Sequence, residues 1–153
     1  MIFTKKESYI KQIALYIQNS DYQNAYDTSK DFVTVFSNEV SARYLLARSA
    51  FLLGKYPDAK NEARLAFNMA DGKKDLIFCA TLLSACYFAL GQKEEAYDIL
   101  SPYSTESGTE IERLMFIFSS AMDKIEEASE HLQRLFALDG KAAQELIDSF
   151  MPT

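Results

Sequence analysis

Residues 51–59 read Phe-Leu-Leu-Gly-Lys-Tyr-Pro-Asp-Ala, and residues 88–96 read Phe-Ala-Leu-Gly-Gln-Lys-Glu-Glu-Ala. In both segments an apolar stretch ends at a single glycine, Gly54 or Gly91, and a more polar stretch then leads to an alanine. Glycine is the residue that most readily ends a helix, and polar residues are common in the first turn of the next helix. Each segment therefore predicts a helix, a tight turn and a second helix.

Apolar residues recur at helical spacing along the rest of the chain, as Tyr44, Ala47, Ala50 and Phe51 do before the first of these turns. No stretch alternates apolar and polar residues in the way a half-buried strand does. Helices are predicted near residues 5–18, 22–36, 39–53, 56–70, 74–90, 93–101, 109–121, 124–138 and 141–150. Capping boxes at their N-termini are predicted at Thr4/Glu7, Thr109/Glu112 and Asp123/Glu126. The predicted fold class is all-α.

Alanine recurs at the equivalent place in four predicted helical hairpins. Ala25, Ala59, Ala96 and Ala128 all lie early in the second helix of a pair, and they are 34, 37 and 32 residues apart. A small side chain at this place lets the two helices of a hairpin approach closely where they cross. A repeat length close to 34 residues indicates a chain of stacked hairpins.

This period and the recurring small residue resemble the tetratricopeptide repeat (TPR) family. The second predicted repeat carries Leu46 and Ala47 at the Leu-Gly pair of the family pattern. The third carries Leu83, Tyr87 and Ala96 at family positions. No unit has the terminal proline of the family and the chain has no tryptophan, so the repeats are degenerate. The alternative, an irregular helical bundle, has no reason to keep a 34-residue period.

The resemblance implies one domain over residues 1–153, a right-handed superhelical solenoid of antiparallel helix pairs. Its repeats are expected at residues 5–37, 39–71, 74–107 and 109–139. Residues 141–150 place Ala143, Leu146, Ile147 and Phe150 on one helix face. This segment is predicted to cap the solenoid end, and a partner-binding helix is the alternative.

The charge of the chain is acidic and unevenly divided. Its 16 Lys and Arg against 22 Asp and Glu give a net charge of −6, with +2 in residues 1–75 and −8 in residues 76–153. There is no run rich in Lys and Arg, so the sequence argues against nucleic acid and anionic membranes as partners. The acidic second part could orient a basic partner, or serve only as a solvated surface.

The spacing of the two cysteines indicates the cellular compartment of the chain. Cys79 and Cys86 are seven residues apart on one predicted helix, so their Cα atoms lie roughly 10 Å apart and cannot form a disulfide. Free thiols, the lack of an apolar leader after Met1 and the lack of a membrane-length apolar stretch predict a cytoplasmic or nuclear chain.

Residues for catalysis or metal binding are sparse. The only histidine, His131, lies among Glu130, Gln133 and Arg134 and is predicted to be a solvated surface residue. The sequence has no metal-ligand spacing, no phosphate-binding glycine loop and no dinucleotide fingerprint. We therefore expect no enzyme activity, no cofactor and no metal.

The resemblance places the partner-binding groove on the first helices of the second and third repeats. The expected groove residues are Tyr44, Leu45, Arg48, Phe51, Phe78, Leu82 and Phe88. Each of them could instead be buried between hairpins. The carboxylate clamp of chaperone-binding family members is missing, since Leu45 and Ala14 stand at its asparagine places.

These observations predict a protein-interaction scaffold that binds a helical or extended apolar segment, or that self-associates as a homodimer. The order of repeat residues is similar to the N-terminal repeats of TPR subunits of the anaphase-promoting complex, which implies a place in a multiprotein complex. The alternative is a secretion-type TPR chaperone that holds an export substrate, because such chaperones are also short, acidic solenoids.

Overall fold

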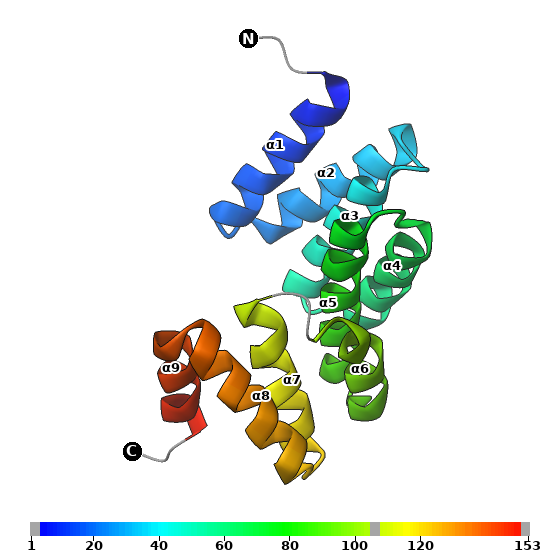
Figure 1. Ribbon diagram of the computed structural model, residues 1–153. Helices are drawn as coiled ribbons and strands as arrows, with labels where there is room; N and C mark the ends of the chain where they lie inside the picture. Colours follow the sequence, from blue (N-terminus) through cyan, green and yellow to red (C-terminus); the bar gives the residue numbers. More distant parts are fainter. Residues whose placement is uncertain (1–3, 105–107, 151–153) are drawn as a thin grey trace. The chain divides into compact units, whose positions relative to one another are not determined.

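The computed structural model describes residues 4–104 and 108–150, and within these ranges the regular structure is entirely helical (Figure 1). The chain divides into two compact units, residues 1–90 and residues 91–153, and each is described by itself. None of the helices within the described ranges is both long and apolar enough to cross a membrane.

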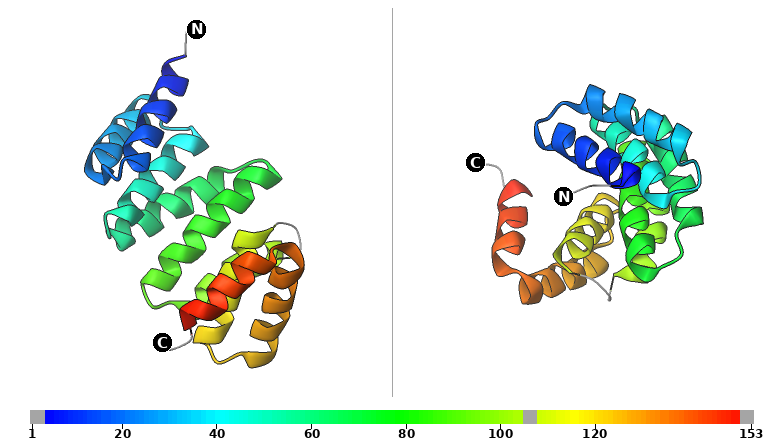
Figure 2. Two further views of the ribbon diagram at one scale, coloured as in Figure 1. Left: turned by 90° about the vertical axis from the view of Figure 1, so that its left-hand side faces the viewer. Right: turned by 90° about the horizontal axis from the view of Figure 1, so that it is seen from above.

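The first unit consists of five helices joined by short turns. They are α1 (Lys5–Gln18), α2 (Tyr22–Val35), α3 (Val40–Leu52), α4 (Tyr56–Met69) and α5 (Lys73–Ala89). Each helix packs antiparallel on the next, and α3 also contacts α1 on one side and α5 on the other (Figure 2). The odd-numbered helices therefore form a continuous layer, as the first helices of stacked hairpins do.

The second unit contains α6 (Lys93–Leu100), a short 3₁₀ helix (Ser101–Tyr103), α7 (Thr109–Ala121), α8 (Ile125–Leu138) and α9 (Gly140–Phe150). Here α7 packs on α6 and α8, and α9 packs on α8 and α7. Every predicted helix is confirmed to within a residue or two at each end. The predicted repeat boundaries stay a prediction, and residues 105–107 at the end of the third repeat lie outside the described residues.

The four repeating alanines are confirmed as buried. Ala25, Ala59 and Ala96 are 0% exposed and Ala128 is 6% exposed. Ala25 belongs to a core cluster with Ile13, Phe32 and Ala42. Since the interior leaves their methyl groups no room to grow, Ala25, Ala59 and Ala128 let α2, α4 and α8 pack closely on the preceding helices α1, α3 and α7.

Each of these alanines is preceded, five residues earlier, by a residue in the left-handed backbone conformation. The residues are Ser20 (φ 59°), Gly54 (φ 77°), Gly91 (φ 80°) and Asp123 (φ 59°). In the first, second and fourth turns the next amide donates to a carbonyl of the preceding helix: Asp21 to Tyr16, Lys55 to Ala50 and Lys124 to Ser119, at 2.8–2.9 Å. These three turns are thus Schellman-type turns, each followed at a fixed distance by a small residue.

Two of the three predicted capping boxes are wrong. Thr4 does cap α1, accepting a hydrogen bond from the Glu7 amide at 3.1 Å. Thr109, however, is already inside α7, whose N-cap is Gly108, and Asp123 adopts the left-handed turn conformation one residue before the N-cap of α8. In the fourth turn, the requirement for a left-handed residue takes precedence over capping.

The expectation that His131 is a solvated surface residue is also wrong. His131 is 3% exposed, and its Nδ1 lies 2.7 Å from Oε2 of Glu112, which is itself 1% exposed. Arg134 donates from Nε to the other oxygen of Glu112 at 3.1 Å. The carboxylate that the capping box assigned to the N-terminus of α7 instead joins α7 to α8, because two donors on α8 satisfy it.

The C-terminal helix α9 covers part of α7 and α8. Ala143 and Leu146 are buried against Leu135, with Phe116 and Leu132 packed around them. Phe150 is 57% exposed and meets the Phe116 ring edge-on, with 5.7 Å between ring centroids. The predicted apolar stripe of this helix is therefore buried at its start and exposed at its end.

The left-handed turns allow a paired test. Replacing Ser20 by Gly should raise the free energy of unfolding by about 0.5–1 kcal/mol, because glycine adopts positive φ without a steric penalty. Replacing Gly54 by Ala should lower it by about 1 kcal/mol through backbone strain alone, since a Cβ at Gly54 would meet no atom within 4 Å. Urea denaturation measures both, and equal stability of the two variants would contradict this account of the turns.

The buried carboxylate allows a second test. Replacing Glu112 by Ala should lower the free energy of unfolding by about 3 kcal/mol, because it removes the buried carboxylate that joins His131 and Arg134 to α7. Glu110, two residues earlier, forms an exposed ion pair with Arg113 at 2.9 Å, and its replacement by Ala should cost less than about 1 kcal/mol. Similar losses for the two variants in thermal or chemical denaturation would show that the buried contact is not a major stabilising interaction.

Candidate functional site

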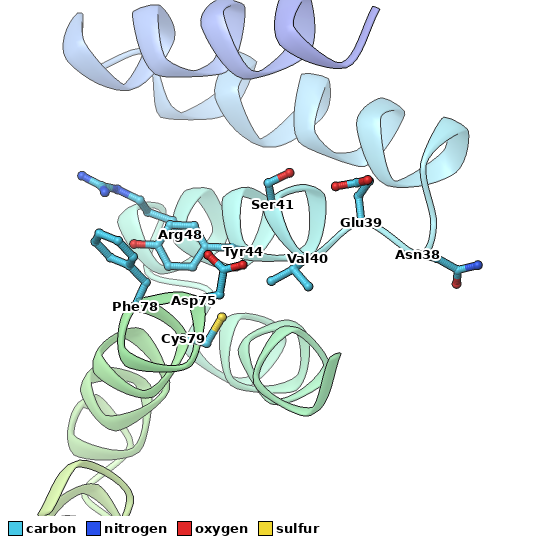
Figure 3. A pocket seen from close by; sticks show the side chains of 9 residues that line it. All are labelled: Asn38, Glu39, Val40, Ser41, Tyr44, Arg48, Asp75, Phe78 and Cys79. Atoms are coloured by element: carbon cyan, nitrogen blue, oxygen red, sulfur yellow. The ribbon is translucent and has the colours of Figure 1, made fainter. Parts of the chain in front are cut away.

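The first unit contains a pocket of about 500 Å³ between α3 and α5, open to solvent (Figure 3). The residues that line it are Asn38, Glu39, Val40, Ser41, Tyr44, Arg48, Asp75, Phe78 and Cys79. We call this the α3/α5 pocket. It lies on the layer of first helices, where the sequence predicts the groove.

Helical spacing brings these residues to one surface. On α3, Ser41, Tyr44 and Arg48 are separated by three and four positions, so their side chains follow one face of the helix. On α5, Asp75 lies one turn before Phe78 and Cys79. Because α3 and α5 contact each other, the two faces border the same pocket.

An aromatic pair forms the apolar part of the pocket. The rings of Tyr44 and Phe78 lie 6.3 Å apart between centroids with an interplanar angle of 66°, close to an edge-to-face arrangement. Phe78 is 51% exposed, and Figure 3 shows its ring beside Tyr44 at the end of the pocket where Arg48 also lies. A phenylalanine ring half exposed to water is an apolar surface available for contact.

Charged groups border the same pocket. Arg48 is exposed and forms no hydrogen bond or ion pair with another described residue. Asp75 is also exposed, whereas Glu39 is paired with Lys6, with 3.4 Å between Oε1 and Nζ. The guanidinium of Arg48 is therefore available to an anionic group of a ligand.

The two cysteines are free and buried in α5. Burial raises the pKa of the Cys79 thiol to about 11, with a smaller contribution from the Asp75 carboxylate. Burial also raises the pKa of Cys86 to about 12, although the nearby Lys60 acts in the opposite direction. Cys79 thus contributes a neutral thiol to the pocket wall, with 1% of its surface exposed.

Of the seven predicted groove residues, the pocket brings together Tyr44, Arg48 and Phe78. Leu45 packs against the core cluster that contains Phe32, and Leu82 is buried at 9% exposure.

The other two predicted groove residues do not line this pocket. The Phe51 ring lies 5.2 Å from that of Tyr56 beside the α3–α4 turn, and Phe88 is half-buried near the end of α5. The assignment of a binding role to any of the seven stays a prediction.

The pocket also contains residues that sequence reasoning missed, notably Ser41, Asp75 and Cys79. The signal for them was present, since Ser41 lies three positions before Tyr44 and Asp75 three positions before Phe78. Asn38 and Glu39 precede α3, and nothing in the sequence pattern marks them. In the part of the chain that the structure describes, no three His, Cys, Asp or Glu side chains are grouped as metal ligands would be.

The raised thiol pKa values predict slow alkylation. At pH 8 a thiol with a pKa of about 11 is roughly 0.1% ionised, against about 10% for an ordinary thiol, so Cys79 should react ~100-fold more slowly in the folded chain than in urea. Cys86 should react more slowly still. Reaction with a chromogenic disulfide reagent measures both rates, and rapid labelling of one thiol in the folded chain would contradict the burial of that residue.

No protein-family model and no curated protein sequence matches this chain. Solved structures do match. TTC0263, a thermophilic TPR protein in Thermus thermophilus, has a TM-score of 0.79 at 17% identity, over 94% of this chain and 82% of that one. MamA 41-end from Desulfovibrio magneticus RS-1 has a TM-score of 0.76 at 15% identity, over 95% and 84%.

A third structure, YrrB, is described as a TPR protein with an unusual peptide-binding site. It has a TM-score of 0.70 at 16% identity, over 92% of this chain and 81% of that one. Likeness at such identities shows the fold, and the fold of this chain is the all-α helical-hairpin fold of TPR proteins, as the sequence resemblance predicts.

Proposed function

We propose that this chain is a non-enzymatic protein-interaction module that binds a segment of another protein in the α3/α5 pocket. The observation that carries the proposal is the combination of a half-exposed Phe78, its neighbour Tyr44 and an unpaired Arg48 around one pocket of about 500 Å³. Aromatic and arginine side chains are the most frequent anchors of protein interfaces. The TPR-type fold supports an interaction role in general, and the peptide-binding site described for YrrB supports a peptide as ligand.

The chemistry of the pocket indicates what the bound segment presents. An apolar side chain would pack on the Phe78 and Tyr44 rings and remove them from water, at roughly 25 cal/mol for each Å² of apolar surface buried. A carboxylate of the segment would pair with the Arg48 guanidinium. A helical or extended apolar segment with a neighbouring acidic group satisfies both.

The wider setting is part of the same proposal. We place the chain in the cytoplasm or nucleus, as a TPR domain of four degenerate repeats within a multiprotein complex of the kind that the anaphase-promoting complex exemplifies. In this setting the bound segment can belong to a second copy of the chain. The alternative is a secretion-type chaperone that holds an export segment in the same pocket, which the acidic net charge of −6 favours.

Selection from a displayed peptide library, followed by calorimetry on the selected peptides, tests the proposal. Phe78→Ser and Arg48→Glu should each weaken binding at least tenfold, because each removes an anchor worth about 2 kcal/mol. Leu65→Ser is the matched control: Leu65 lies on α4, is 44% exposed and does not line the pocket, so its replacement should leave the affinity unchanged. Circular dichroism should show native helicity in all three variants.

Selected peptides that bind all three variants equally well would overturn the assignment of the pocket. Sedimentation velocity distinguishes the subunit of a multiprotein complex from the secretion-type chaperone. A homodimer that Phe78→Ser dissociates supports the complex subunit, whereas a monomer that binds extended apolar peptides with little sequence preference supports the chaperone.

A further inference from the structure

The second unit has an apolar surface that α9 covers only in part. Ile125, in the first turn of α8, is 79% exposed, the largest exposed fraction among the large apolar side chains that the structure describes. With Ser129, Leu132 and Phe136 it forms a stripe at i, i+4, i+7 and i+11 along α8. This is the spacing at which a second helix packs along the first.

The corresponding position in the first unit is covered. Counting from the repeating alanines, Ile125 is equivalent to Tyr56 in α4, which is half-buried and packs its ring on Phe51 at 5.2 Å. In the second unit, α9 packs on Leu132 and Leu135 of α8 and on Phe116 of α7. Figures 1 and 2 show α9 next to the C-terminal part of α8. At the N-terminal end of α8, Ile125 stays 79% exposed and is not covered by α9.

A shallow pocket of about 350 Å³ occupies this place between α7 and α8. Its apolar wall consists of Phe116, Ile125 and Leu132, and its polar rim consists of Ser120, Asp123 and Ser129. Two antiparallel helices form its sides, so the depression runs between helix ridges, which is the shape that accepts another helix. We call it the α7/α8 pocket.

The side chains that line the α7/α8 pocket carry no positive charge, although Lys93 lies close by and donates from Nζ to the Ala121 carbonyl at 3.3 Å. Asp123 lines the pocket, and Glu126 is exposed on the turn that follows Ile125. Lys124, the nearest cation in sequence, places Nζ 4.8 Å from the centroid of the Tyr97 ring. The unit as a whole carries 13 acidic against 5 basic side chains.

We infer that the α7/α8 pocket is a second docking site, for an amphipathic helix of a partner protein whose apolar face is flanked by lysine or arginine. The apolar face packs on Ile125, Leu132 and Phe116, and the flanking cations lie against Asp123 and Glu126. This site belongs to a different unit from the α3/α5 pocket and does not depend on the function proposed there. The chain then joins two partners of different chemistry.

Two designed 18-residue peptides test the inference on the full chain. Both carry leucine at alternating three- and four-residue spacing, and they differ only in having lysine or glutamate at the flanking positions. Fluorescence anisotropy should show binding of the lysine peptide that weakens between 50 and 300 mM NaCl, and at least tenfold weaker binding of the glutamate peptide.

Ile125→Asp separates specific docking from general attraction. It adds a negative charge, so electrostatics alone would strengthen binding of the lysine peptide, whereas loss of the apolar anchor should weaken it at least tenfold. Because Ile125 is 79% exposed, the thermal midpoint should be unchanged. Leu138→Asp, at a 55% exposed position on the same helix outside the pocket, is the matched control and should leave the affinity unchanged.

Three results would overturn the inference. The first is an affinity that Ile125→Asp leaves unchanged or raises, and the second is an equal loss in Leu138→Asp. The third is a homodimer in sedimentation velocity that Ile125→Asp dissociates, since a second copy would then occupy the pocket. Phe78→Ser should not affect the lysine peptide, so failure of this site and failure of the α3/α5 pocket remain distinguishable.

Discussion

The close crossing of two helices at a buried alanine is the contact on which the rest of the fold depends. Ala25 and Ala59 have no exposed surface, Ala128 is 6% exposed, and a left-handed residue five positions before each of them sets the direction of the second helix. A turn at the wrong distance would present a larger side chain at the crossing and push the helices apart. Turn and alanine therefore form one constraint, which the chain satisfies at intervals of 32–37 residues.

This constraint also positions the α3/α5 pocket. Because the hairpins of the first unit are tight, α3 contacts both α1 and α5. Side chains on the facing surfaces of α3 and α5 then border the same space. For this reason Tyr44 and Phe78, which are 34 positions apart in the sequence, have ring centroids 6.3 Å apart. The position of the pocket therefore depends on the repeat length, which brings α3 and α5 together, as well as on the side chains that line it.

Sequence reasoning succeeded where the deciding interactions are local. Helix positions, the buried alanines and the place of Tyr44, Arg48 and Phe78 on first helices follow from spacing within one or two turns. It failed for His131, because the partner that buries it, Glu112, is 19 residues away and fits a capping box equally well on paper. It also could not separate the exposed Phe78 from Leu82, one turn later on the same helix, since only the neighbouring helices determine which of the two is covered.

The contact of Glu112 with His131 and Arg134 has a consequence for how uniquely the second unit is packed. Apolar contacts specify the rotation of one helix against another less sharply than a polar contact does, because the hydrophobic effect is non-directional. A buried carboxylate held by two donors at 2.7 and 3.1 Å is satisfied at a single rotation and a single height of α8 against α7. Together with the tight turn at Asp123 and the buried Ala128, this polar contact selects one alignment of α7 and α8, and with it the shape of the neighbouring α7/α8 surface.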